Sequence, residues 1–105
     1  MANIVVLLDA VGATGPGPIV RMDINITRQG GSIPILLSGV ITATVQLEGT
    51  IATDYDINNN LAVFEAISNA VWTADTADGL FTPFTHIRAN VVSWTAGTIT
   101  MKTLM

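Results

Sequence analysis

Apolar and polar residues alternate along several stretches of this chain with a period of two, the spacing that places successive side chains on opposite faces of a β-strand. The clearest stretch is residues 19–27, in which four apolar residues alternate with three polar ones. Residues 39–51 alternate in the same way, which predicts a strand with one face on the core. Residues 4–8 and 33–37 are short apolar runs that predict buried strands, and Pro34 places the second at a sheet edge or a strand end.

The last quarter of the chain has the most informative pattern. Residues 83–94 and residues 98–104 are two alternating runs rich in β-branched residues, and Thr95-Ala96-Gly97 separates them. Glycine tolerates the backbone angles of a tight turn, so this pattern predicts a β-hairpin at the end of the chain.

The rest of the chain predicts further strands and turns. Residues 61–71 fit either a short helix or a strand, and the strand is favoured because Trp72 and Thr73 continue it with strand-like residues. Residues 12–18, 29–32 and 75–79 are rich in turn-forming residues, and residues 80–84 lead into the hairpin. Seven or eight short strands at this spacing predict an all-β fold, an antiparallel β-sandwich or jelly roll, in one domain spanning residues 1–105.

Composition changes this picture in one respect. Only 11% of the 105 residues are charged while 50% are hydrophobic, whereas about 25% are charged in an ordinary soluble domain. This charge is too sparse to cover a solitary monomer, so we expect part of the surface to be shared with other subunits of a homo-oligomer.

The sign and spacing of the charges exclude several partners. Four basic residues face eight acidic ones, and no run of Lys or Arg is long enough to follow a phosphate backbone, which argues against nucleic acid. Asp9 interrupts the first apolar run, so neither a signal peptide nor a membrane span is expected, and the chain is expected to be made in the cytosol. The absence of cysteine excludes disulfides and thiol chemistry.

Catalysis has little support in the residue pattern. His86 is the only histidine, and a nucleophile such as Ser68 or Ser93 would have to reach it through folding alone. A structural or interface role for His86 is therefore favoured, and no enzyme activity is expected.

One loop has the spacing of a calcium site. Five oxygen-bearing residues stand at positions 1, 3, 5, 7 and 12 of a twelve-residue stretch, as in an EF-hand loop: Asp54, Asp56, Asn58, Asn60 and Glu65. Asn59 replaces the glycine of that motif, and the preceding residues predict a strand where the motif has a helix. A polar surface loop is the favoured interpretation, with calcium as the alternative and no other cofactor expected.

Arg88 stands in the middle of a largely apolar predicted strand. A cation there has to face solvent, a carboxylate or a partner, because burying an unpaired charge is costly. A solvated or locally paired arginine is favoured, and a salt bridge to another subunit is the alternative.

Several segments resemble small structural proteins of tailed bacteriophages. In that family a V-x-V-x-G-S strand precedes a variable loop, and a Y-I-R-A-x-V strand pairs with a final G-x-V-T-V strand. The corresponding segments here are Leu8-Asp9-Ala10-Val11, residues 12–18, Val45-Gln46-Leu47-Glu48-Gly49-Thr50, His86-Ile87-Arg88-Ala89-Asn90-Val91 and residues 97–101. His86 stands where the family usually has tyrosine, and residues 54–60 replace a loop with Asp-Gly and Trp.

The resemblance implies a virion component without catalytic activity. The first expectation is a capsid decoration or cement protein that associates with itself and docks on the major capsid protein. A tail, connector or fibre-associated protein is the second, and a carbohydrate-binding module of a phage adhesin is the third. In each case the outward face of the last strands, with His86, Arg88 and Asn90, is predicted to lie near a partner subunit.

Overall fold

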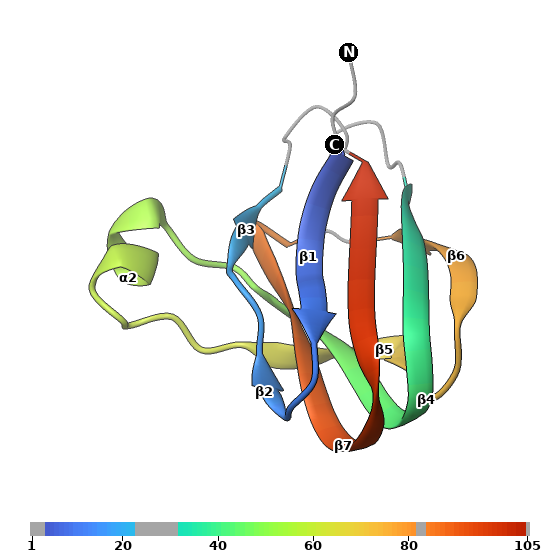
Figure 1. The fold of residues 1–105 in the computed structure, drawn as a ribbon. Coiled ribbons are helices and arrows are strands. Elements are labelled where there is room, and N and C mark those ends of the chain that lie inside the picture. The colour runs from blue at the N-terminus through green and yellow to red at the C-terminus, as the bar shows by residue number, and fades with distance from the viewer. Residues whose placement is uncertain (1–3, 23–31, 82–83, 105) are drawn as a thin grey trace.

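The computed structural model describes residues 4–22, 32–81 and 84–104, and it confirms an all-β fold (Figure 1). Within these residues, seven strands form one antiparallel sheet and a five-residue helix interrupts them. The elements are β1 (Ile4–Val11), β2 (Gly15–Pro16), β3 (Val20–Arg21), β4 (Ser32–Thr50), α2 (Asp54–Asn58), β5 (Glu65–Trp72), β6 (Thr76–Phe81) and β7 (His86–Leu104).

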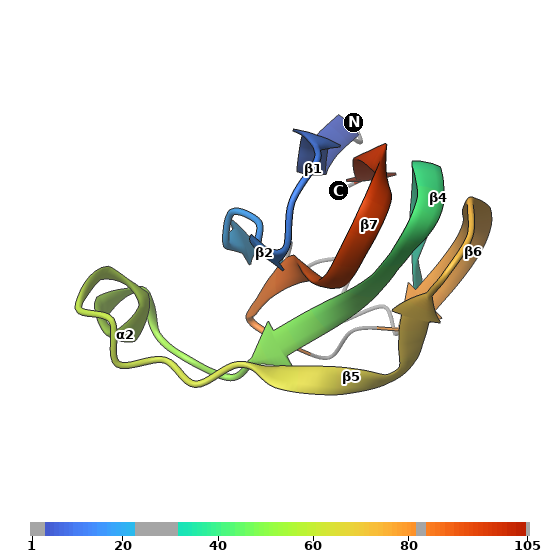
Figure 2. The same cartoon turned by 60° about the horizontal axis from the view of Figure 1, so that its bottom comes forward.

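Two long strands organise the sheet. Strands β4 and β7 each contain 19 residues and pair with each other from Ile35 opposite Thr103 to Thr50 opposite His86. The other described strands each pair with one of these two. Strands β1 and β6 flank one half of the long pair, and β2, β3 and β5 flank the other half. The sheet bends between the two halves, as Figure 2 shows.

The core lies between the two halves of the bent sheet. The inward positions of the alternating strands are apolar and buried, so their removal from water is the main force that stabilises the fold. On the long strands these residues are Ile33, Ile35, Leu37, Ala43, Val45 and Leu47 of β4 and Ile87, Ala89, Val91, Ile99 and Met101 of β7. Leu7 and Leu8 of β1, Met22 after β3, and Ile67 and Ala70 of β5 complete it.

Two glycines allow the long strands to bend together. Gly39 has φ 79° and Gly97 has φ 123°, both in the region that side chains disfavour. A Cβ atom on Gly39 would collide with the carbonyl oxygen of Thr98, and one on Gly97 would collide with that of Gly39. The pairing register of β4 with β7 also shifts around Gly39. The two backbones therefore touch at the bend, where only glycine fits.

The predicted hairpin is wrong. Residues 95–97 lie inside β7, and the runs on either side of them form one strand that pairs with β4 along both halves. The glycine signal was real, but Gly97 bends a strand here instead of reversing the chain. For the same reason the strands predicted at residues 33–37 and 39–51 are a single strand, because Gly39 serves the matching bend.

The predicted turn at residues 75–79 is also wrong, since β6 begins at Thr76 and pairs with the first half of β4. Pairing of Ala77 and Gly79 with Leu36 and Pro34 outweighs the local turn preference of these residues. Strand, the favoured alternative for residues 61–71, is confirmed from Glu65 onward. Most of the strand predicted at residues 19–27 and of the turn at 29–32 lies outside the described residues, as does Pro83.

Gly39→Ala tests the contact at the bend. We expect it to lower the free energy of unfolding by about 3 kcal/mol, because the new methyl group meets a fixed backbone oxygen at a positive φ. Gly12→Ala is the control, since its Cβ would meet its nearest neighbours at 3.8 Å, and we expect a change within about 0.5 kcal/mol. Urea denaturation measures both, and equal effects would contradict this account of the bend.

Thr103→Val tests a buried hydroxyl group. Oγ1 of Thr103 is buried without a hydrogen-bond partner in the described part of the chain. Replacing it with a methyl group of similar size removes the cost of burying an unsatisfied hydroxyl, so we expect the free energy of unfolding to rise by about 1 kcal/mol. The matched change at exposed Thr98 on the same strand is expected to leave stability unchanged. Chemical denaturation that shows a loss at Thr103→Val would refute the expectation.

Candidate functional site: an arm and an apolar groove

The connection between β4 and β5 projects away from the sheet, with α2 in it (Figures 1 and 2). We call residues 51–64 the arm. Thr53 begins the helix through a capping box: its hydroxyl accepts a hydrogen bond from the backbone N–H of Asp56 at 3.2 Å, and the Asp56 carboxylate accepts one from the backbone N–H of Thr53 at 3.3 Å. None of the helix residues is buried. The arm therefore has defined local structure but contributes no side chain to the core.

The calcium loop was predicted in this segment. An α-helix occupies residues 54–58, the Asp56 carboxylate caps that helix, and Glu65 belongs to β5. In the described part of the chain, no three His, Cys, Asp or Glu side chains gather into a group that could hold a metal ion. Calcium binding by Asp54, Asp56, Asn58, Asn60 and Glu65 stays a prediction. Within the expected polar surface loop, residues 54–58 form a helix, and residues 59–64 belong to neither a helix nor a strand.

The outer face of β7 carries the three residues predicted to meet a partner. Ile87, Ala89 and Val91 are buried in the core, and the alternating positions His86, Arg88 and Asn90 point to the opposite face, as the strand pattern indicated. The structure gives all three of them partners within the same chain. Contact with another subunit stays a prediction for these residues.

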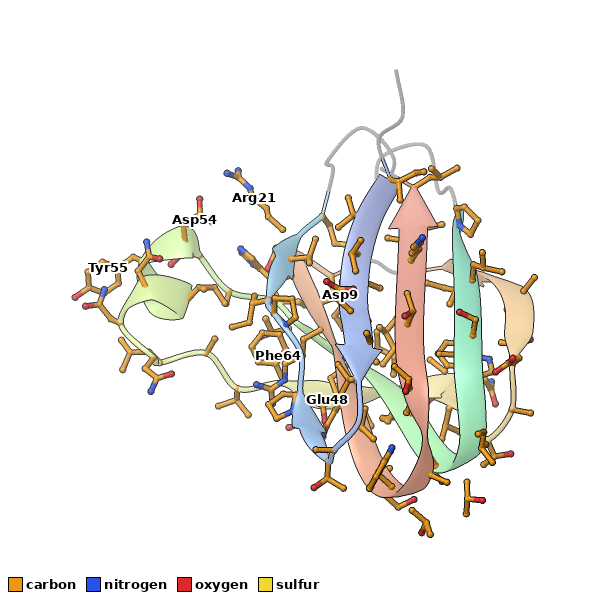
Figure 3. All side chains as sticks on the ribbon, viewed as in Figure 1. Asp9, Arg21, Glu48, Asp54, Tyr55 and Phe64 are labelled. Carbon is orange, nitrogen blue, oxygen red and sulfur yellow. The ribbon has the colours of Figure 1, made fainter. Side chains whose placement is uncertain are left out.

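His86 holds the first end of the arm. Its side chain is buried, with the residue only 4% exposed. Nε2 lies 3.1 Å from Oδ1 of Asp54, and Nδ1 lies 3.0 Å from Oγ1 of Thr85. Arg21 of β3 donates to the other oxygen of Asp54 at 3.1 Å. Figure 3 shows the Arg21 side chain near Asp54 of the arm. Asp54 therefore joins the start of the helix to two separate strands.

The group Asp54, His86 and Thr85 contains the residue types of a hydrolase triad. The Thr85 hydroxyl, however, accepts a hydrogen bond from the backbone N–H of Ala52 at 2.9 Å. It also lies within donating distance of the carbonyl oxygens of Ala52, at 2.9 Å, and Thr50, at 3.1 Å. A hydroxyl group has one proton and two lone pairs, so these contacts engage it with the backbone of the arm. The chemistry that this group supports best is anchoring, and neither Ser68 nor Ser93 takes part in it.

Arg88 holds the second end of the arm. Its Nε donates to Oε1 of Glu48 at 2.7 Å, and Asn90 donates to the other oxygen of that carboxylate at 3.2 Å. The guanidinium group lies 4.3 Å from the ring centroid of Phe64, within the range of a cation–π interaction. Local pairing of Arg88, the favoured interpretation of the sequence, is confirmed. Phe64 is the last residue of the arm, so both ends of the arm contact the outer face of β7.

The arm exposes apolar side chains along its length. Four large residues are between 61% and 80% exposed: Ile51, Tyr55, Leu61 and Val63. Figure 3 shows Tyr55 at the outer end of the arm, far from Phe64 at its base. A polar cluster, residues 58–60, separates these positions in the sequence. The signal that could have found them is the set of large apolar residues on either side of that cluster.

A second apolar surface lies on the half of the sheet that β1 and β6 flank, on the side of the molecule opposite the arm. It is an open groove of about 550 Å³ lined by Ile4, Pro34, Ile35, Leu36, Ala77, Asp78, Gly79, Lys102, Thr103 and Leu104. The register places Leu36 beside Lys102 and Ala77, and Ile4 beside Leu104. The sequence contains a signal for this groove, because residues 4–8 and 33–37 are apolar at outward as well as inward positions.

Comparison with protein-family models, with curated proteins and with solved structures finds no match for this chain. In the part of the chain that the structure describes, no helix has the length and apolar character needed to cross a membrane. The candidate site consists of an apolar arm, held at both ends, on one side of the molecule and an apolar groove on the other.

Thr85→Val tests the anchor at the first end of the arm. The substitution keeps the side-chain shape and removes the hydroxyl, so the Ala52 N–H loses its acceptor. We expect amide hydrogen exchange at Ala52 to become about two- to ten-fold faster, since an exposed hydrogen bond of this kind contributes about 0.5–1.5 kcal/mol. Exchange in the core of β4, at Val45 for example, is the internal control. Unchanged protection at Ala52 would show that Thr85 does not hold the arm.

Proposed function

We propose that this chain is a non-enzymatic structural subunit of a bacteriophage virion, and first a capsid decoration protein. In this role it binds copies of itself and docks on the major capsid protein after synthesis in the host cytoplasm. The observation that supports this most is the large apolar area left exposed on the arm and in the groove of a chain with few charges.

The energetics favour association at these surfaces. Burying one large aliphatic or aromatic side chain contributes about 1.5–3 kcal/mol. Four such residues on the arm together supply free energy of the same order as the about 4–15 kcal/mol lost in freedom of motion when two proteins associate. The arm is also held at both ends before any partner arrives, so little further ordering is required.

The polar groups support the same role. His86 is buried and its ring nitrogens face Asp54 and Thr85, which leaves it no open face for a substrate. Glu48, Arg88 and Asn90 satisfy one another on the outer face of β7. These groups position a binding element, which is the task of a structural subunit.

The oligomeric state tests the proposal in solution. We expect sedimentation velocity to show assemblies larger than a monomer that grow with protein concentration. Because apolar contacts drive this association, raising the ionic strength is expected to leave the assemblies intact, whereas contacts between surface charges would weaken. A monomer that stays fully soluble at high concentration would contradict self-association.

The copy number in particles tests the role within the virion. Quantitative mass spectrometry of purified phage particles is expected to find this chain in amounts comparable to the major capsid protein. A few copies per particle would assign it to the tail or connector instead, and absence from particles would refute a virion role altogether.

A further inference from the structure

We infer that the arm of one copy of this chain inserts into the groove of a second copy, so that subunits associate head to tail. This inference rests on the proposed function, because it specifies the surfaces through which the subunit associates. The arm supplies exposed apolar side chains on a projecting segment, and the groove supplies an apolar concave surface. The two surfaces thus have complementary shapes and similar chemistry.

The arm cannot fill the groove of its own chain. Both of its ends are held on the outer face of β7 near its start, through Asp54 with His86 and through Phe64 with Arg88. The groove lies on the other half of the sheet, between β1 and β6. Figures 1 and 2 place α2 and β6 on opposite sides of the molecule. An arm that enters this groove therefore belongs to another copy.

The groove contains two charged residues, Lys102 and Asp78, and the Asp78 carboxylate accepts hydrogen bonds from Nε1 of Trp72 at 3.3 Å and from the backbone N–H of Gly79 at 2.8 Å. Arg21 and Arg88 are each paired with a carboxylate, while Lys102 in the groove forms no ion pair with any described residue. The arm contains two acidic residues, Asp54 and Asp56, and no basic residue. Asp54 is paired with Arg21, but Asp56 has no cation near it among the described residues. A second copy brings the Asp56 carboxylate, whose hydrogen bond is the capping-box contact with its own helix, to a lysine without an ion pair among the described residues.

The size of the groove agrees with this occupant. Its volume of about 550 Å³ lies within the about 300–1,000 Å³ of sites that enclose drug-sized ligands, so the groove has room for large apolar side chains of the arm. Because arm and groove are different surfaces, each subunit keeps one free arm and one free groove after binding. Contacts of this kind close into rings or extend into filaments, depending on the angle between subunits.

A mixing experiment with two variants tests the inference. The arm variant is Tyr55→Ser with Leu61→Ser, and the groove variant is Leu36→Glu, which places a carboxylate beside Lys102. We expect each variant alone to be monomeric by sedimentation velocity. An equimolar mixture is expected to form a heterodimer and nothing larger, since only the intact arm of the groove variant and the intact groove of the arm variant can bind.

Controls separate this result from loss of folding. Ile41 is 72% exposed and belongs to neither the arm nor the groove. The Ile41→Ser variant is expected to assemble like the unmodified chain. Circular dichroism and the denaturation midpoint of each variant are expected to stay close to those of the unmodified chain, because none of the substituted residues is buried. Lys102→Gln is expected to weaken assembly about two- to five-fold, with Lys102→Arg restoring it, as for an ion pair at the rim of an interface.

Other outcomes overturn the inference in distinguishable ways. Assembly lost in the arm variant but retained in the groove variant means that arms bind each other, and the reverse means that grooves do. Two monomeric variants that fail to form a heterodimer also reject the arm-to-groove contact. Each of these results leaves the proposed structural role intact. A monomeric unmodified chain that is absent from particles would reject that role as well.

Discussion

The contact between the backbones of β4 and β7 at Gly39 and Gly97 is the constraint on which the rest of this structure depends. Two strands of 19 residues cannot enclose a core if they stay straight, and a bend requires both strands to change direction at the same place. The glycines allow this because a side chain at either position would collide with the facing backbone. The bend divides one sheet into two halves whose inner faces share the core, and it separates the arm from the groove.

The outer face of β7 shows how polar residues can position an exposed segment through contacts within the same chain. His86, Arg88 and Asn90 look in sequence like residues that await a second subunit. In the folded chain they engage Asp54, Thr85, Glu48 and Phe64 and hold both ends of the arm. In the proposed assembly their contribution is indirect, because they fix where the apolar residues of the arm are displayed.

The low content of charged residues corresponds to apolar surface at particular places in the folded chain. In many small domains exposed apolar residues are scattered singly and have no functional meaning. Here seven of the thirteen large exposed apolar residues in the described part of the chain belong to the arm or line the groove, on opposite sides of the molecule. A chain with one projecting and one concave apolar surface is suited to repeated association with copies of itself. This arrangement connects the composition of the chain to the structural role proposed for it.

The sequence by itself determined the all-β fold and the alternation of buried residues at 43–47 of β4 and 87–91 of β7, and it favoured a solvated or locally paired Arg88. These features depend on alternation and on the cost of burying charge, both of which are local. Only the tertiary structure decided that the glycines at 39 and 97 bend strands, that residues 76–81 pair with β4, and that His86 meets Asp54. A positive φ suits a turn as well as a bend, so the choice depends on which backbone lies opposite. The arm and the groove likewise became visible only in the folded chain, because the exposure of a side chain depends on what packs around it.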